Sequence, residues 1–158
     1  MSQETRSETA TSTGTGLADW QAGIVGGLVG GLAMGAMLSM TNAPALEGAI
    51  PALYFLAPPP NGLAGWVVHM FHSAILGVVF TAVAAGVGVS RNVGRSAVVG
   101  LVYGVVLWVV LAALVMPLWL SAVGFPPGPP FPNFALPGSL PAHAVYGLLL
   151  GVVYSFLR

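Results

Sequence analysis

Long apolar runs, interrupted by charge at widely spaced points, dominate the pattern of this chain. Uncharged stretches cover residues 20–46, 48–90 and 96–157. A helix needs about 20 apolar residues to cross a hydrocarbon core roughly 30 Å thick. The first stretch therefore accommodates one span, the second one span with a connection, and the third two spans. We predict membrane-spanning helices over 20–42, 62–88, 94–118 and 139–157.

Composition supports this interpretation. Only 5% of the residues are charged and 56% are hydrophobic, with a mean hydropathy of +0.90, whereas an ordinary soluble domain carries about 25% charged residues. The chain lacks the repeated apolar–polar alternation of a transmembrane barrel. The predicted fold class is an all-α polytopic membrane protein with four transmembrane helices. A net charge of zero without a basic patch excludes a nucleic-acid partner.

The four arginines predict the orientation. With four spans, Arg6, Arg91, Arg95 and Arg158 all fall on the side that carries both termini. Positively charged loops stay in the cytoplasm, so we expect a multi-pass protein of the plasma membrane with cytoplasmic N- and C-termini. Residues 1–18, rich in Ser and Thr, are predicted to form a disordered tail. Residues 19–158 are predicted to form the transmembrane domain.

All thirteen prolines fall on the opposite side of this topology. They lie in the two connections there or at adjacent helix ends. Proline fixes φ and lacks an amide proton. The sequence therefore predicts stiff, non-regular caps over the helix ends.

The two halves of the chain resemble each other at an ungapped shift of 74 residues. The shift superposes Gly26 on Gly100, Gly30 on Gly104, His69 on His143 and Gly77 on Gly151. We interpret this as a duplication, with one repeat over about 20–88 and the other over about 94–158. Each repeat is a helical hairpin, so a pseudo-twofold axis along the membrane normal is expected to relate them.

Small residues recur every four positions on the predicted helices. Such stripes allow close approach of helices in lipid, where packing rather than the hydrophobic effect drives association. The glycines expected at helix contacts are Gly23, Gly27, Gly31, Gly35, Gly77, Gly100, Gly104, Gly147 and Gly151.

Three histidines lie within the predicted spans, and ionisable residues at membrane depth commonly mark functional sites. In a purely structural interpretation, His69, His72 and His143 bond to the proline-rich connections near the headgroups. In a second interpretation, His69 and His143 face each other across the pseudo-twofold axis and ligate a b-type haem.

Two further interpretations remain open. His69 and His72, three positions apart on one helix face, could join His143 in a zinc or copper site, with Glu47 as fourth ligand or base. Alternatively, a quinone or other amphiphile could bind between the second and fourth helices, or a homo-oligomer could transport a small solute. In the amphiphile site, the hydrogen-bonding groups would be His72, Tyr146 or Tyr154. Met70, Phe71 and Met116 would form its apolar wall.

Several motifs resemble those of a family of small four-helix membrane proteins common in halophilic archaea, whose activity is not established. They are Gly65-Trp66-x-x-His69, Tyr103-Gly104-x-x-x-Trp108, Met116-Pro117-x-Trp119 and His143-x-x-Tyr146-Gly147-x-x-x-Gly151-x-x-Tyr154. The resemblance covers about residues 60–158 and implies the four-helix fold without an activity. Some similar proteins carry the label "histidine kinase", but this chain has no segment that could form an ATP-binding domain.

Classical enzyme chemistry finds little support. The chain has no cysteine, and Glu47 is the only carboxylate on the proline-rich side. We therefore expect a non-enzymatic membrane subunit that packs with itself or a larger complex. The alternative is a protein that binds a cofactor or amphiphile at the paired histidines.

Overall fold

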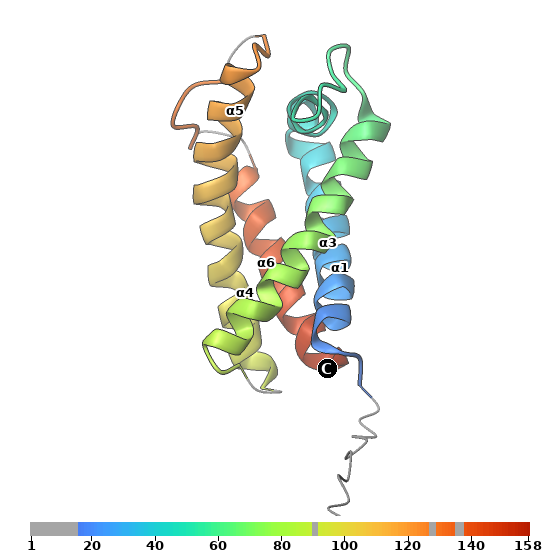
Figure 1. Cartoon of the computed structure of the whole chain (residues 1–158), viewed down its shortest axis with the longest axis vertical. Helices are drawn as coiled ribbons and strands as arrows, with labels where there is room; N and C mark the ends of the chain where they lie inside the picture. Colours follow the sequence, from blue (N-terminus) through green and yellow to red (C-terminus); the bar gives the residue numbers. More distant parts are fainter. Residues whose placement is uncertain (1–15, 90–91, 127–128, 135–137) are drawn as a thin grey trace, which may run out of the picture.

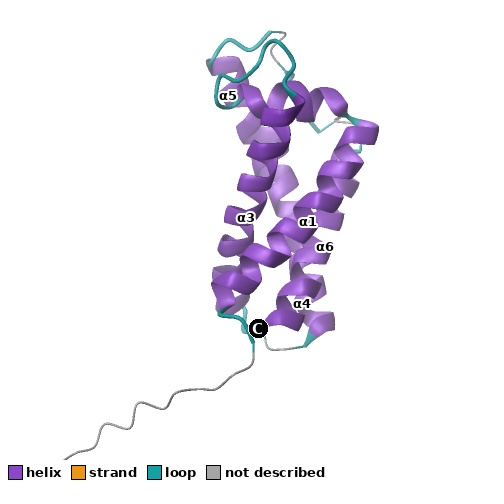
Figure 2. Ribbon diagram, turned by 90° about the vertical axis from the view of Figure 1, so that its right-hand side faces the viewer, coloured by secondary structure: helices purple, strands orange, loops and turns teal. Residues whose placement is uncertain are grey.

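A computed structural model describes residues 16–89, 92–126, 129–134 and 138–158 of the chain. It contains four helices long and apolar enough to cross a membrane, and the described residues form no strand (Figures 1 and 2). The helices are α1 (Asp19–Thr41), α3 (Gly62–Gly86), a continuous helix made of α4 (Val93–Leu107), η2 (Trp108–Val115) and α5 (Met116–Ala122), and α6 (Ser139–Leu157). The predicted all-α fold with four span-length helices is confirmed.

The predicted helix ends agree with the observed ones to within about two residues, except that the third helix continues to Ala122. Two asparagines explain where helices begin. The side chain of Asn61 accepts a hydrogen bond from the Ala64 amide (3.0 Å), and that of Asn92 accepts one from the Arg95 amide (2.9 Å). Each thereby satisfies an amide that has no partner inside the first helical turn.

Some sequence predictions concern residues outside the described ranges. They are the disordered tail up to residue 15, the cytoplasmic placement of Arg6 and Arg91, and the contributions of Pro127 and Pro137 to the second connection.

The prediction of non-regular caps is wrong for the first connection. Residues between α1 and α3 form a π-helical turn, η1 (Ala45–Ala49), which continues into the short α2 (Ile50–Ala52). Pro51 lies at the start of α2, where a missing amide proton costs little. Because Pro51 has no amide proton to donate to the Glu47 carbonyl, four residues earlier, that carbonyl accepts a hydrogen bond from the Asn61 amide (2.7 Å).

The long helices pack in the spatial order α3, α1, α6 and α4. Helix α1 contacts both α3 and α6, and α6 also contacts α4. Helices α3 and α4 touch little and diverge from the turn that joins them (Figure 1). We call the end with that turn and the C-terminus the terminal end, and the opposite end the loop end.

Helix α1 approaches its two neighbours through two glycine faces. A Cβ added at Gly23 or Gly27 would collide with the backbone of α3 at Gly77 or Ser73. A Cβ added at Gly26 or Gly30 would instead meet α6, at Leu150 or Tyr146. Adjacent residues point about 100° apart around a helix, so alternating glycine pairs serve both neighbours. The remaining predicted contact glycines also lie against a neighbouring helix: Gly31 and Gly35 against α3, Gly77 against α1, Gly100 and Gly104 against α6, and Gly147 and Gly151 against α4.

Helix α4 has only one such face. Gly100 lies against Gly147 and Gly151 of α6 in the way that Gly27 lies against Ser73 and Gly77 of α3. The packing counterpart of Gly100 is therefore Gly27, one residue away from the Gly26 that the ungapped alignment superposes on it.

This register explains why α3 and α4 diverge. Counted from the Gly27–Gly100 pair, Val99 and Tyr103 of α4 take the places that Gly26 and Gly30 hold on α1. Two bulky side chains thus face α3 where two glycines admit α6 to α1. The Tyr103 hydroxyl donates to the Leu76 carbonyl of α3 (2.8 Å), so the tyrosine side chain spans the distance between the two backbones. The extensive contact between α1 and α6 therefore has no equivalent between α4 and α3, and the predicted pseudo-twofold arrangement is not confirmed.

Aromatic side chains fill the terminal end of the bundle. The Phe80 ring lies 5.4 Å from the rings of both Tyr103 and Tyr154, and Phe80 and Tyr154 are fully buried. Below them, Arg158 forms an ion pair with Asp19 (3.2 Å) and donates to the Val89 carbonyl (2.9 Å). This end is closed, and the distance between α3 and the continuous helix α4–η2–α5 widens toward the loop end (Figure 1).

Candidate functional site

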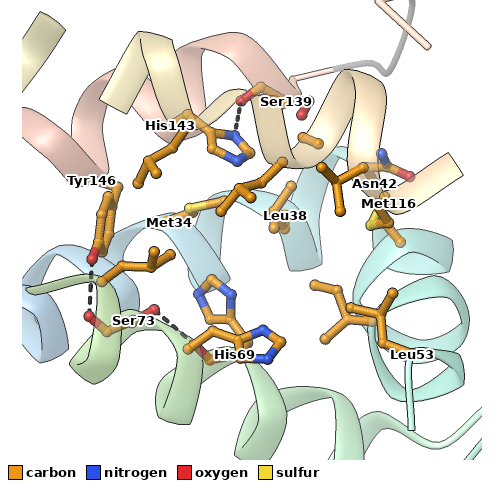
Figure 3. Close-up of a pocket in the computed structure, with 18 of the residues that line it drawn as sticks. Met34, Leu38, Asn42, Leu53, His69, Ser73, Met116, Ser139, His143 and Tyr146 are labelled. Carbon is orange, nitrogen blue, oxygen red and sulfur yellow. Dashed lines mark hydrogen bonds between the residues drawn. The ribbon is translucent and has the colours of Figure 1, made fainter. Parts of the chain in front are cut away.

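A cavity of about 370 Å³ lies between α3 and η2, in the half of the bundle nearer the loop end. Helices α1 and α6 form its floor, where Met34 and Leu38 of α1 are buried. Figure 3 shows the cavity with residues of all four long helices around it. Its lining residues are Met34, Leu38, Asn42, Ala45, Ile50, Leu53, His69, His72, Ser73, Ile75, Leu76, Leu107, Leu111, Ala112, Val115, Met116, Trp119, Ser139, His143 and Tyr146.

The cavity opens sideways, on the face of the bundle between α3 and η2. Ile75 of α3 and Val115 of η2 line the cavity and are 45% and 49% exposed, so they form its rim. At the loop end, α2 and α5 close the space: Trp119 donates to the Leu53 carbonyl (3.1 Å), and Ala52 packs against Leu120. If the span-length helices cross a bilayer, this apolar rim faces lipid tails rather than water.

His69 is fixed by a bond to the neighbouring helix. Its ring lies in the close contact between α3 and α1, and it is 5% exposed. Nε2 lies 2.9 Å from the carbonyl oxygen of Gly31, and the His69 carbonyl accepts from the Ser73 hydroxyl (2.8 Å). Gly35, one turn further along α1, leaves the room that the rings of Trp66 and His69 occupy. This arrangement fixes the plane of the His69 ring.

His143 approaches from the opposite wall. In Figure 3, α6 carries His143 on one side of the cavity and α3 carries His69 on the other, with Met34 and Leu38 of α1 between them. The Nδ1 atom of His143 lies 2.8 Å from the Ser139 carbonyl of its own helix. The structure thus brings His69 and His143, which the 74-residue shift superposes, to one cavity, as the interpretations with a shared site require.

His72 also lines the cavity, but its ring is paired with the first connection. Its Nε2 atom lies 2.7 Å from the hydroxyl of Tyr54. His69 bonds to α1 and His72 to the residues after α2, so the two rings are held by different partners. Among the described residues, no group of three or more histidine, aspartate or glutamate side chains could hold a metal ion. The three-histidine metal site is therefore not assembled, and Glu47 does not line the cavity.

A haem fits the cavity poorly. Its two propionates need cationic or strongly polar partners, and no arginine or lysine is among the described residues that line the cavity. The four arginines of the chain lie at positions 6, 91, 95 and 158, and the two that the structure describes lie at the terminal end. Without a cationic side chain in its described lining, the cavity suits a neutral molecule better than a dianionic cofactor.

The other predicted binding residues separate into two groups. Tyr146 lines the cavity, but its hydroxyl already donates to the Ser73 carbonyl (2.9 Å), so it holds α6 against α3 (Figure 3). Met116 lies on the wall as expected. Tyr154 is buried in the aromatic cluster of the terminal end, and Phe71 is 57% exposed on the outer face of α3. Neither Phe71, Tyr154 nor Met70 lines the cavity, because the helical turn directs them elsewhere.

Sequence reasoning missed the η2 segment, which supplies Leu111, Ala112 and Val115 to the cavity wall. π-Helical segments are rare and occur frequently at functional sites. The sequence signal for an irregular helix at this point was Pro117, because proline has no amide proton to donate to the Ala113 carbonyl four residues earlier. That carbonyl accepts instead from the Asn133 amide of the second connection (2.9 Å).

The amide of Asn42 was also missed. Asn42 lies at the end of α1 and lines the cavity, and its Nδ2 atom is buried without a hydrogen-bond partner among the described residues. Buried polar atoms without partners are uncommon, so this end of the cavity has an unused hydrogen-bonding group.

Comparisons with known proteins assign no relatives to the chain. No protein family matches it, and no curated protein or solved structure is significantly similar to it.

Proposed function

We propose that the chain is a multi-pass membrane protein that binds a neutral amphiphile, taken sideways from the bilayer, in the cavity between α3 and η2. The observation that carries the proposal is the cavity itself. Its volume of about 370 Å³ lies within the range of small-molecule sites, which are mostly apolar with a few oriented polar groups. Three histidines line this otherwise apolar space, and ionisable residues at membrane depth commonly mark functional sites.

The mode of entry follows from the rim. Ile75 and Val115 would lie among lipid tails, whereas the loop end is closed by Trp119 and Leu53. A molecule dissolved in the bilayer can therefore enter without crossing water. The described residues around the cavity include no paired carboxylates, which favours binding over catalysis.

The proposal includes the duplication and the membrane orientation. Several cavity residues occupy matching places in the two hairpins: Met34 and Leu107, Leu38 and Leu111, His69 and His143, His72 and Tyr146. This pairing supports an ancestral site between two copies of one hairpin. The positions of Arg95 and Arg158 at the terminal end support a cytoplasmic location for that end.

A cavity-blocking variant tests the function. Val115 and Val110 both belong to η2 and are 49% and 43% exposed, but only Val115 lines the cavity. The probe is 2-decyl-1,4-dimethoxybenzene, a neutral ring with one hydrocarbon tail, added to the protein in lipid nanodiscs. We expect saturable thermal stabilisation of the unmodified protein, because a ligand at 100 times its Kd adds about 2.7 kcal/mol to native stability. Val115→Phe should abolish the stabilisation, and the matched control Val110→Phe should retain it.

Two results would contradict the proposal. One is the absence of saturable stabilisation by this ether and also by the corresponding hydroquinone. The other is equal stabilisation of Val115→Phe and the unmodified protein, which would assign the effect to the bilayer or to another surface.

A further inference from the structure

The hydrogen bonds of His69 and His143 determine which ring nitrogens remain free. A carbonyl oxygen only accepts, so the nitrogen facing it must carry the proton. In His69 that nitrogen is Nε2, which faces Gly31, and in His143 it is Nδ1, which faces Ser139. In the neutral rings, Nδ1 of His69 and Nε2 of His143 are therefore unprotonated acceptors. Neither atom has a hydrogen-bond partner among the described residues.

The cavity thus carries two acceptors on opposite walls, held in place by bonds to the backbone. Reversing either tautomer would place a lone pair against a carbonyl oxygen and lose the bond that orients the ring. Tyr146 adds no free donor, because its hydroxyl is already bonded to Ser73. Nδ1 of His69 and Nε2 of His143 are therefore complementary to a molecule that donates hydrogen bonds, whereas Nδ2 of Asn42, which has no partner among the described residues, supplies a donor elsewhere in the lining.

The apolar lining indicates what carries those donors. The thioethers of Met34 and Met116 and the ring of Trp119 line the same space. Methionine sulfur and aromatic side chains both make favourable contacts with aromatic rings. An aromatic ring between these walls would direct its substituents toward the histidines, and a tail would leave through the rim at Ile75 and Val115.

We propose that the cavity selects an aromatic alcohol with a hydrocarbon tail, of the hydroquinone class, whose hydroxyl groups donate to Nδ1 of His69 and Nε2 of His143. This inference rests on the proposed function and specifies its ligand. It distinguishes the hydroquinone from its ether and from the oxidised quinone, which both lack a hydroxyl donor.

The deciding experiment compares three probes that share one ring and one tail: 2-decyl-1,4-hydroquinone, its dimethyl ether and the corresponding 1,4-benzoquinone. Each is titrated into the unmodified protein in nanodiscs, without oxygen for the hydroquinone, and its Kd is obtained from thermal stabilisation. A hydrogen bond between neutral groups changes an equilibrium constant by about twofold to tenfold. We therefore expect the hydroquinone to bind about tenfold more tightly than the ether, with the quinone close to the ether.

Variants of His143 test the assignment of the acceptor. His143→Leu should weaken hydroquinone binding about threefold to fivefold and leave ether binding unchanged. His143→Gln, which keeps an acceptor at a similar reach, should recover most of the preference for the hydroquinone. Melting curves without probe establish that both variants are folded. The three-probe comparison needs no variant and stays decisive if His143→Leu fails to fold.

Equal binding of hydroquinone and ether would overturn the inference while leaving the proposed function intact. Tighter binding of the quinone would also overturn it, since the ring would then accept from a donor such as Nδ2 of Asn42 instead of donating to the two histidines. A His143→Leu variant that weakens both probes equally would show that His143 shapes the cavity without receiving a hydrogen bond. Failure of all three probes to bind would contradict the proposed function itself.

Discussion

At Gly100, the carbonyl oxygen of Gly147 lies where a side-chain carbon would have to stand. The same holds at Gly27, where the obstructing carbonyl belongs to Ser73. A backbone carbonyl cannot rotate away as a side chain can, so these contacts admit no residue other than glycine without separating the helices. Close approach of this kind provides the dispersion contacts that hold helices together in lipid.

Gly100→Ala is therefore expected to be destabilising. Overpacking a tight interior costs about 1–3 kcal/mol, and we expect a clearly lower melting temperature in detergent. The matched control is Gly86→Ala at the end of α3, where an added Cβ meets nothing within 4 Å. This change should leave stability the same or slightly higher, because alanine favours a helix over glycine. Equal melting temperatures for the two variants would contradict the packing described here.

At the scale of elements, each connection at the loop end is attached to a helix through a carbonyl that a proline leaves free. Pro51 frees the carbonyl of Glu47 for the Asn61 amide, and Pro117 frees that of Ala113 for Asn133. In both cases the connection supplies the amide proton that the helix lacks. The prolines thus join the connections to the helices as well as stiffening them.

Pro117→Ala tests this attachment. The new amide at position 117 can bond to the Ala113 carbonyl and compete with Asn133. We expect the Asn133 amide to exchange with solvent deuterium about twofold to tenfold faster, in line with the loss of one hydrogen bond. Pro126→Ala, at an exposed site in the same connection, is the control and should leave that exchange unchanged. Unaltered exchange at Asn133 in Pro117→Ala would refute the competition.

In the whole molecule, the terminal end is closed by polar contacts, and the half nearer the loop end contains the cavity. Arg158 joins the start of α1 to the turn between α3 and α4, and the Leu17 amide donates to the Leu157 carbonyl (2.7 Å). Residues 16–18, predicted as the end of a disordered tail, are therefore part of the folded end. The half toward the proline-rich connections holds the cavity, and Tyr103, nearer the terminal end, bridges α4 and α3 through its bond to the Leu76 carbonyl.

The orientation of this asymmetric molecule can be measured directly, because the chain has no cysteine. Val87→Cys places an exposed thiol at the terminal end, and Phe131→Cys places one in the second connection. A membrane-impermeant maleimide added to intact cells should label Phe131→Cys and should label Val87→Cys only after lysis. The reverse pattern would place both termini outside and the mouth of the cavity in the opposite half of the bilayer.

The positions of charge, proline and apolar runs were enough to predict the number of span-length helices, nearly all of their ends and the half of the bundle that holds the histidines. The reason is that charge is expelled from hydrocarbon and a span has a fixed length, so the positions of eight charged residues and the prolines suffice. His69, His72, His143 and Tyr146 were candidate binding residues in interpretations that the sequence left open, and the structure places all four around one cavity. The all-α fold is confirmed, and the duplication stays a prediction.

Which helices touch, and where the space between them lies, became known only from the folded chain. The faces of a helix change by about 100° with each residue, so an alignment displaced by one position exchanges one face for another. The ungapped shift paired Gly26 with Gly100, whereas the contacts pair Gly27 with Gly100 and leave Tyr103 opposite α3. That single-residue difference changes which face of α4 is turned toward α3, and apolar composition alone carries no information about it.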